Sequence, residues 1–418
     1  MKKTLRTLMI PAMAMASIAG LAACDNAGSG EAVKVGLICL HDNSSTYDAN
    51  FIKALDEAVA KLGKKVEFQK AWLKTGVEET RDCYDAAKEL AELGCDVVFA
   101  DSFGHQPHML DAAKELPNVQ FCHATGTNAK TANRDNYHNA FASIYEGRYL
   151  AGYAAGLKLT TMSNADFTNG FKVGYVGAYD YAEVKSGYTS WFLGVRQALR
   201  DMDKDASKVQ MDVKFTNSWY DPDAESSAAD ALIKGGAILI SQHADSMGAP
   251  GTCESAKVPN VTYNVETKTQ CPQTYLAYSR INWAPYYEAV VNAVYAKKNI
   301  KDEVNHNWTG TLATGSVEYN VNWDNFPADK KADFQAKVKA IENEVKTKGA
   351  KKVFDCSTFT VGGQPVTTYM ADTDGDFAGD TEAIVKDGSL SYFNESAYCS
   401  APYFALDIDG INLPAKQN

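Results

Sequence analysis

Residues 33–40 read VKVGLICL, an apolar run with the length of a single buried strand. The sequence predicts an amphipathic helix directly after it, over 50–62, and Gly63 ends that helix. A buried strand that leads into a helix favours a parallel sheet, because parallel strands need a crossover connection. The chain therefore begins as an α/β protein.

The same order of strand and helix recurs in two series. The first continues with strands at 65–72, 96–100 and 119–123 and helices at 77–93 and 109–116. The second has helices at 145–159, 190–202, 223–234 and 284–298 and strands at 171–177, 209–215, 237–241 and 261–265. A charged helix at 328–348 and Gly- and Thr-rich strand candidates from Val353 form a different tail. Two series in tandem predict two doubly wound α/β lobes, whose strand ends share one cleft.

Composition excludes several classes of protein. The 418 residues include 41 Lys or Arg and 52 Asp or Glu, a formal net charge of −11, so we expect no nucleic-acid partner. With 45% hydrophobic and 22% charged residues, the chain is globular and not disordered. Beyond the N-terminus no apolar run reaches about 18 residues, so the sequence predicts no internal membrane span.

The N-terminus has the features of a secretory signal. Residues 1–23 combine a basic start with a short apolar core, and Leu21-Ala22-Ala23 before Cys24 resembles a bacterial lipobox. This predicts a lipoprotein signal peptide, acylation of Cys24 and a flexible tether over 24–31. Asp25 resembles the retention signal of inner-membrane lipoproteins, which places the protein on the periplasmic side of the bacterial inner membrane. The alternative is a plain signal peptide followed by a chance cysteine.

Eight cysteines remain when Cys24 is set aside, an even number that suits an oxidising compartment. Cys253 with Cys271, and Cys356 with Cys399, are candidates for local disulfides. The other four can pair or remain buried thiols. No C-x-x-C spacing occurs, so we expect no zinc site and no other resident metal.

Motifs for catalysis are missing from the sequence. It contains no phosphate-binding loop, nucleophile elbow, H-E-x-x-H or dinucleotide fingerprint, so it predicts neither an enzyme nor a cofactor. Ser102, His123 and several Asp residues could be arranged as a hydrolase triad, but the sequence has no nucleophile elbow to support one. Ser and His at strand ends are more often ligand hydrogen-bonders or structural caps. The acidic stretch 372–376 departs from a calcium loop and is read as a solvated turn around Asp374-Gly375.

The residues that follow predicted strands are rich in aromatic rings, acids and amides. These segments are 41–48 (HDNSSTYD), 101–104 (DSFG), 124–126 (ATG), 217–222 (NSWYDP) and 242–246 (QHADS), with Asn282-Trp283 at the start of a helix. Fixed acceptors and donors beside flat apolar faces suit a planar, nitrogen-rich heterocycle. Trp219 has polar neighbours on both sides, which favours a ligand role for it. Trp283 is as compatible with the core as with the ligand.

Four stretches together resemble the basic membrane protein family, the PnrA-like substrate-binding lipoproteins of ABC importers. They are 47–51 (YDANF), 145–152 (YEGRYLAG), 218–222 (SWYDP) and 242–246 (QHADS). The similarity runs from about Val33 to Pro327. It implies a type I periplasmic-binding-protein fold, a hinge crossed three times, a purine ligand and a permease partner in the inner membrane. We expect a monomer.

The resemblance also divides the chain. Lobe 1 is expected to comprise 32–142 and 266–310. Lobe 2 is expected to comprise 143–265 and 311–418, including the cysteine-bearing tail.

The chain departs from the family pattern at positions that are expected to contact ribose in the nucleoside binders. The family's nucleoside binders carry Asn where this chain has Ile52, Asp near the position of Thr125, and a Lys that is missing before Asn282. A free purine base such as adenine is therefore the expected ligand. In this hypothesis Trp219 stacks on the base and Phe103 forms the opposite face. The remaining expected ligand-binding residues are Asp48 and Asp245, as acceptors, and Asn43, Asn282 and Trp283, which close the site.

Three alternatives remain open from the sequence. The scaffold can carry a purine nucleoside or another small solute, such as a sugar or an amino acid. A nucleoside hydrolase would need a positioned base and a nucleophile or metal. A lipoprotein receptor would bind no small ligand at all.

Overall fold

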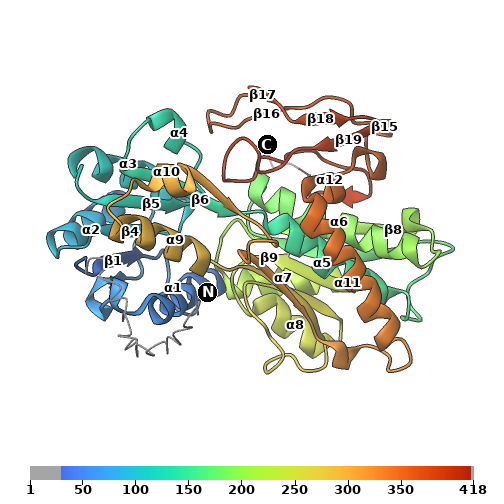
Figure 1. Ribbon diagram of the computed structural model, residues 1–418. Coiled ribbons are helices and arrows are strands. Elements are labelled where there is room, and N and C mark those ends of the chain that lie inside the picture. Colours follow the sequence, from blue (N-terminus) through green and yellow to red (C-terminus); the bar gives the residue numbers. More distant parts are fainter. Residues whose placement is uncertain (1–29, 416–418) are drawn as a thin grey trace, which may run out of the picture.

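The computed structural model describes residues 30–415, which form two lobes side by side (Figure 1). The predicted signal peptide, Cys24 and most of the predicted tether lie outside these residues. Among the described helices, none combines the length and the apolar character needed to cross a membrane.

Lobe 1 is built on an all-parallel sheet in the order β12-β6-β5-β4-β1-β2, with β3 also paired to β1. Its strands are β1 (Val33–Ile38), β2 (Val66–Glu67), β3 (Leu73–Lys74), β4 (Val97–Ala100), β5 (Gln120–Ala124), β6 (Tyr137–Ala142) and β12 (Asn307–Gly310). Its helices are α1 (Thr46–Leu62), α2 (Arg81–Glu92), α3 (Gln106–Glu115), α4 (Ala129–Ala132), α9 (Ala284–Tyr295) and α10 (Ile300–Val304). Helices α1 and α9 cover one face, and α2 and α3 cover the other (Figure 1).

Lobe 2 contains the sheet β13-β11-β10-β9-β7-β8-β20, in which only β13 pairs antiparallel. Its strands are β7 (Phe171–Gly177), β8 (Val209–Phe215), β9 (Ala237–His243), β10 (Asn260–Tyr263), β11 (Tyr275–Ile281), β13 (Val317–Val321) and β20 (Ile411–Asn412). Its main helices are α5 (Ile144–Leu159), α6 (Ala182–Asp201), α7 (Pro222–Lys234), α8 (Gly248–Ala256) and α11 (Lys331–Lys348), with the short α12 (Ala350–Val353). The two doubly wound lobes form the expected type I periplasmic-binding-protein fold.

Three connections cross between the lobes: β6 to α5 at Ser143, β11 to α9 at 282–283, and β12 to β13 over 311–316. The second crossing corrects one predicted boundary. Residues 266–281 were assigned to lobe 1, but β11 pairs with β10 and β13 and so lies in the sheet of lobe 2. The sequence pattern missed β11, and without it the chain appeared to leave lobe 2 too early.

Local sequence explains where several elements begin. Helix α1 starts at Thr46, before the predicted residue 50, because the Ser45 side chain caps it by accepting a hydrogen bond from the Asp48 backbone N–H. The predicted strand 65–72 is interrupted by a 3₁₀ turn at Lys70–Trp72, which leaves the short strands β2 and β3. Helix α6 starts at Ala182 rather than 190, since its first half is stabilised by burial against neighbouring elements.

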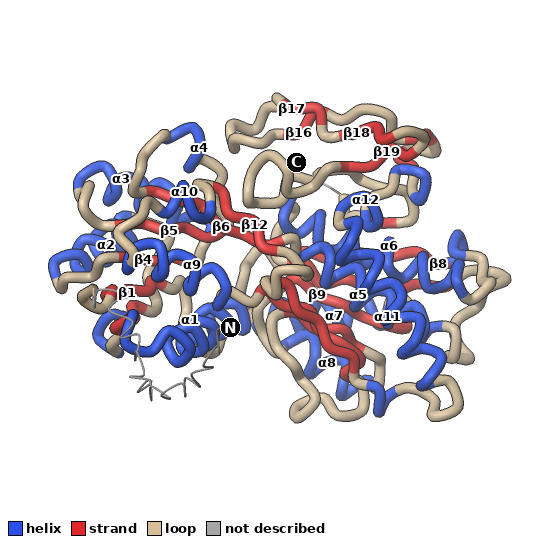
Figure 2. Tube along the Cα trace, in the orientation of Figure 1, coloured by secondary structure: helices blue, strands red, loops and turns tan. Residues whose placement is uncertain are grey.

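The C-terminal tail packs on lobe 2 and also reaches lobe 1. It contains three small antiparallel ladders formed by β14 (Thr360–Val361), β15 (Gln364–Pro365), β16 (Met370–Ala371), β17 (Thr381–Glu382), β18 (Ile384–Asp387) and β19 (Leu390–Phe393) (Figure 2). Phe354 and Phe404 stack with ring centroids 4.7 Å apart beneath them. The Ser400 hydroxyl donates to the Gly126 carbonyl of lobe 1 at 3.3 Å. Between β16 and β17 the chain turns at Gly375, which has φ 85°.

All eight cysteines of the described chain are buried free thiols, so the structure contradicts the two predicted disulfides. Cys253 lies in the core beside α7 and α8, where its sulfur accepts a hydrogen bond from the Asn260 amide at 3.7 Å. The Cys399 thiol donates to the Ala401 carbonyl at 3.1 Å, and its predicted partner Cys356 is likewise an unpaired thiol. Proximity in sequence did not bring the Cβ atoms into the geometry that a disulfide requires.

Helices α5 and α6 pack closely because glycines face backbone on both of them. A Cβ on Gly152 would lie 2.0 Å from the Trp191 carbonyl oxygen, and a Cβ on Gly194 would lie 2.1 Å from that of Tyr149. Even the smallest side chain would therefore force the two helices apart. The close packing of α5 against α6 in lobe 2 depends on these two contacts.

We therefore expect Gly152→Ala to lower the free energy of unfolding by about 1–3 kcal/mol, because the added methyl overpacks a backbone contact. Gly251→Ala is the matched control: it also lies in a helix, but its Cβ meets nothing within 4 Å. The control should be neutral or stabilising by up to about 1 kcal/mol, owing to the higher helix propensity of Ala. Urea unfolding of both variants measures the difference, and equal stabilities would contradict the packing argument.

Candidate functional site

A cavity lies between the lobes, where the carboxyl ends of strands from both sheets meet. The space between its lining residues, including the part that is open to solvent, is about 400 Å³. Lobe 1 contributes Leu40, His41, Tyr47, Asp48, Ser102, Phe103 and Thr125, and lobe 2 contributes Glu183, Trp219, His243, Asp245 and Tyr263. Each lobe therefore supplies aromatic rings and at least one carboxyl group.

Direct contacts between the lobes show that the cavity is closed. The Thr46 backbone N–H donates to the Asp245 carbonyl at 2.8 Å. The rings of Phe103 and Tyr181 approach to 5.9 Å between centroids. These contacts join the first turn of α1 to the loop after β9, so any ligand in the cavity touches both lobes.

Asp48 is the carboxylate that lobe 1 contributes to the lining of the cavity. One carboxylate oxygen accepts the His41 backbone N–H at 2.8 Å, and the other lies 3.4 Å from His41 Nδ1. Burial acts to raise the pKa of Asp48, but hydrogen bonds from His41 and Ser45 outweigh it and hold that pKa below its ordinary value. The same hydrogen bond to Asp48 raises the pKa of His41. Asp48 is therefore an ionised acceptor.

Trp219 stands on the side of lobe 2 within a group of aromatic rings. Its ring packs edge-on against Tyr179 at 5.0 Å and lies 6.1 Å from Tyr181. Asp221, two residues later, caps α7 by accepting the backbone N–H groups of Asp223 and Ala224. The Asp-Pro pair of the SWYDP stretch thus has a structural role, because it fixes the loop that presents Trp219 to the cavity.

The polar groups of lobe 2 are neutral or strongly perturbed. Burial raises the pKa of Glu183 to about 7 and that of Asp245 well above its ordinary value. Burial also lowers the pKa of His243 well below its usual value, and the nearby Arg148 adds to this. His243 Nε2 lies 3.6 Å from Glu183 Oε1, and the Asn264 amide donates to Asp245 Oδ1 at 3.2 Å. This wall offers uncharged donors and acceptors.

Arg148 supports this wall from behind. Its guanidinium donates to the Gln242 carbonyl at 2.7 Å and to the Tyr175 hydroxyl at 2.8 Å, and it stacks 3.6 Å from the centre of the Tyr263 ring. Arg148 comes from α5, in the YEGRYLAG stretch. That stretch therefore contributes to the site through a buried cation that does not line the cavity.

Four of the seven predicted ligand-binding residues line the cavity: Asp48, Phe103, Trp219 and Asp245. The other three are placed elsewhere, which corrects the prediction. Asn43 is an exposed loop residue that does not line the cavity. Asn282 precedes α9; its Oδ1 accepts the Ala284 N–H, while its amide donates to Glu318. Trp283 is 1% exposed and stacks on Phe51 at 4.3 Å, so it belongs to the core.

Glu183 and Tyr263 line the cavity, although neither was among the predicted site residues. The information was present in the sequence, because Tyr263 ends β10 and Glu183 follows β7 by six residues. The rule that ligands bind beyond the carboxyl ends of parallel strands applies to both. A prediction that also covered the ends of the strands at 171–177 and 261–265 would have included them.

Ser102 and His123 do not form a catalytic pair in the described structure. His123 Nε2 contacts the Ser102 backbone carbonyl at 2.7 Å, and the Ser102 hydroxyl donates to Glu79 at 2.6 Å. Burial lowers the pKa of His123 to about 3. The histidine thus has a structural hydrogen bond where a hydrolase would need a general base near the hydroxyl.

Residues 35–352 match a family profile described as ABC transporter substrate-binding protein, PnrA-like. A purine-binding protein of Brucella abortus is 32% identical over 295 residues, which cover 69% of this chain and 77% of that protein. A Haloferax volcanii protein named as a candidate glucose-binding protein of an ABC transporter is 30% identical over 233 residues. That alignment covers 55% of this chain and 54% of the relative.

Solved structures of solute-binding proteins share the fold. One from Aeropyrum pernix has a TM-score of 0.60 at 14% identity and covers 75% of this chain and 91% of its own. One from Conexibacter woesei has a TM-score of 0.56 at 19% identity and covers 76% and 97%. The profile spans most of the two lobes and their shared cavity, and the chain therefore belongs to the PnrA-like family of ABC transporter substrate-binding proteins.

Proposed function

We propose that this protein captures a purine, with a free base such as adenine favoured, and delivers it to the permease of an ABC importer. The observation that carries the proposal is the pairing of a flat ring with hydrogen-bonding groups from both lobes. Trp219 and Phe103 offer aromatic faces, while Asp48 and Asp245 stand in the same closed cavity. Stacking together with in-plane hydrogen bonds is how proteins recognise a base.

The charges of the groups that line the cavity support an uncharged ligand. Among its carboxyl groups, Asp48 is ionised, whereas burial raises the pKa of Glu183 and Asp245. A neutral heterocycle with N–H donors and ring nitrogen acceptors matches this set, and an anion does not.

The absence of an acid at Thr125 favours a base over a nucleoside. Thr125 is buried in the left-handed conformation (φ 64°), and its hydroxyl donates to the Ala124 carbonyl at 2.6 Å. Its hydroxyl proton is therefore already engaged, and the oxygen can only accept. A ribose would find weaker hydrogen bonding here than a carboxylate could give it.

Transport follows from the two-lobed fold. The lobes would open about the three crossings, close on the ligand and dock on the permease in the closed form. We also propose that Cys24 is acylated, which would hold the protein on the periplasmic side of the inner membrane and raise its effective concentration at the permease.

Adenine at about 100 times its dissociation constant should increase the free energy of unfolding by about 2.7 kcal/mol, because it binds only the folded state. Urea unfolding with and without adenine measures the stabilisation.

Trp219→Ala should lower adenine affinity about 10–100-fold through the loss of stacking. Trp323→Ala is the matched control, since Trp323 packs on Phe326 away from the cavity. Titration calorimetry of ligand-stripped protein with adenine, adenosine and glucose measures the affinities. Tighter binding of adenosine or glucose would replace the proposed ligand, and unchanged affinity in Trp219→Ala would exclude stacking.

Glu183→Gln should make stability less dependent on pH. Burial raises the folded-state pKa of Glu183 from 4.5 to about 7, so its contribution is complete below the unfolded value and is lost as pH rises through about 7. Glutamine does not ionise. The variant should match the wild type near pH 5 and exceed its free energy of unfolding by about 2–3 kcal/mol near pH 8. Urea unfolding at both pH values tests this, and parallel pH profiles would refute the neutral Glu183.

Cys24→Ser should release the protein from the membrane fraction into the soluble periplasmic fraction, because two or three acyl chains give firm anchoring. Fractionation with mass spectrometry of the mature N-terminus measures this. Unmodified Cys24 in the wild-type protein would show that the segment is a plain signal peptide.

A further inference from the structure

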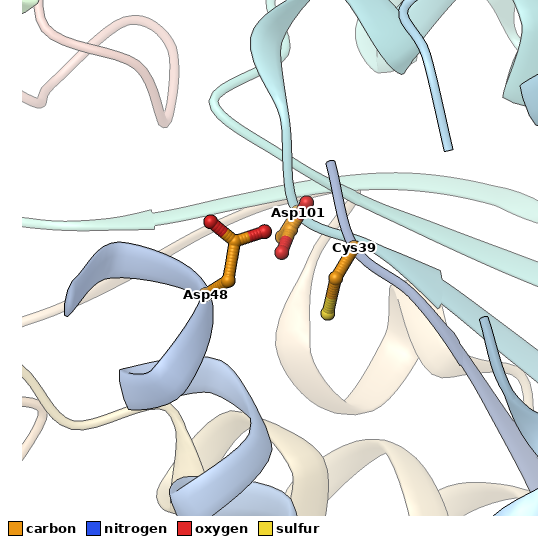
Figure 3. A group of neighbouring side chains, drawn as sticks. All are labelled: Cys39, Asp48 and Asp101. Atoms are coloured by element: carbon orange, nitrogen blue, oxygen red, sulfur yellow. The ribbon is translucent and has the colours of Figure 1, made fainter. Parts of the chain in front are cut away.

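Behind the cavity, three buried side chains from different elements converge. The Sγ of Cys39 and one carboxyl oxygen each of Asp48 and Asp101 all lie within 4.8 Å of one another. Cys39 follows β1, Asp48 lies in the first turn of α1, and Asp101 follows β4 (Figure 3). Asp48 lines the cavity, but Asp101 does not. Asp101 can therefore affect a ligand only through the residues beside it that line the cavity, and Asp48 is the one among them that offers a carboxylate.

The two carboxyl groups have unequal surroundings. Asp48 accepts hydrogen bonds at both oxygens, from the backbone and the ring of His41. Asp101 accepts the Leu40 backbone N–H at Oδ1 at 3.1 Å, and the Cys39 thiol is also hydrogen-bonded to it. Its other oxygen, Oδ2, is buried and has no hydrogen-bond partner among the described residues. An ionised Asp101 would leave that oxygen as a buried, unpaired charge beside a second carboxylate, at a large cost in free energy.

Burial and the charge of Asp48 raise the pKa of Asp101 well above its ordinary value. No lysine or arginine of the described chain forms an ion pair with Asp101, and His41, whose pKa is raised, contacts Asp48. The titratable groups packed around Asp101 are Cys39, Tyr47, Asp48, Cys83, His105 and Tyr287. His105 Nδ1 is 3.9 Å from Asp101 Oδ1, but burial lowers the pKa of His105, and its Nε2 is bonded to the Val77 carbonyl. A single proton shared by the two acids satisfies Oδ2 and leaves one negative charge in the pair.

We propose that Asp101 is a positioning residue for ligand recognition: its carboxyl proton is shared with Asp48 and holds the Asp48 carboxylate toward the cavity. One lone pair of Asp48 then accepts the proton of Asp101. The contacts from His41 fix the orientation of the carboxylate, and a remaining lone pair can accept an N–H of the ligand. The part of this inference that concerns the ligand rests on the proposed function. The shared proton itself is a property of the unliganded protein.

The affinity for the ligand should depend on pH through this proton. The proton is present at neutral pH and is lost only as pH rises through the raised pKa of Asp101. Its loss places two negative charges side by side and turns Asp48 away from its aligned position. Loss of this proton should therefore add a fall in adenine affinity at alkaline pH, separate from the changes near neutral pH that come from Glu183, whose pKa is about 7, and from His41.

The first test uses substitutions that keep or remove the donor. Asp101→Asn replaces the O–H with an amide N–H that does not ionise, so adenine affinity at pH 7 should stay within about threefold of wild type and lose its alkaline fall. Asp101→Leu removes the donor and should weaken binding about tenfold or more. In an Asp48→Asn background, Asp101→Leu should cost no further affinity, because Asp101 acts through Asp48. An additive cost, or an alkaline fall that persists in Asp101→Asn, would overturn the positioning role.

The second test needs no ligand. Infrared spectra at pH 7 should show less intensity in the C=O band of protonated carboxylic acids for Asp101→Asn than for wild type. Glu395→Gln is the control, since burial raises the pKa of this remote tail residue to about 8: it should lose band intensity without changing the adenine profile. An unchanged band in Asp101→Asn, or stoichiometric metal in the purified protein, would overturn the shared proton. A wild type that binds no purine would overturn the proposed function alone, because the infrared result still decides the proton.

Discussion

The structure depends on one constraint, the removal of several carboxyl groups from water between two closing lobes. Asp48, Asp101, Glu183 and Asp245 all lie at strand ends or helix starts around a single cavity. They are not all easily ionised there, since buried charges of one sign close together repel strongly. Hydrogen bonds hold the pKa of Asp48 low, so that it carries a charge, whereas burial raises the pKa values of Glu183, Asp245 and Asp101. That pattern of one acceptor among neutral donors and acceptors is also what defines the complementary ligand.

The fold makes this arrangement available. All strands of lobe 1, and all but one of lobe 2, run parallel, so the loops after β1, β4, β5, β7, β9 and β10 face the same gap. Helices α5 and α6 give lobe 2 a rigid body because their glycines bring the two backbones into contact. Arg148 extends from α5 to the ends of β9 and β10 and fixes the wall of the cavity there. Three crossings between two rigid lobes are the natural place for opening and closing.

Four of the predicted site residues, Asp48, Phe103, Trp219 and Asp245, line the cavity, because each follows a strand that its apolar pattern reveals. Asn282 and Trp283 also follow a strand, β11, but they lie on the connection that crosses to α9 of lobe 1, away from the cavity. The local pattern of Trp283 is the same for a core ring as for a ligand-stacking ring, and its partner Phe51 is more than 200 positions away. The two predicted disulfides failed for the same reason, since spacing along the chain does not fix Cβ geometry.

The sequence by itself determined the α/β class, the two lobes, the family and the edge of each sheet at which a ligand would bind. These follow from periodicity and short motifs, which are local properties of the chain. Only the tertiary structure decided which strand-end residues share the cavity, that β11 belongs to lobe 2, and that Asp101 stands beside Asp48. Those facts depend on sheet order and on burial. Burial also sets the protonation of Glu183, Asp245 and Asp101, because a carboxyl group acquires its pKa from its surroundings and not from its neighbours in sequence.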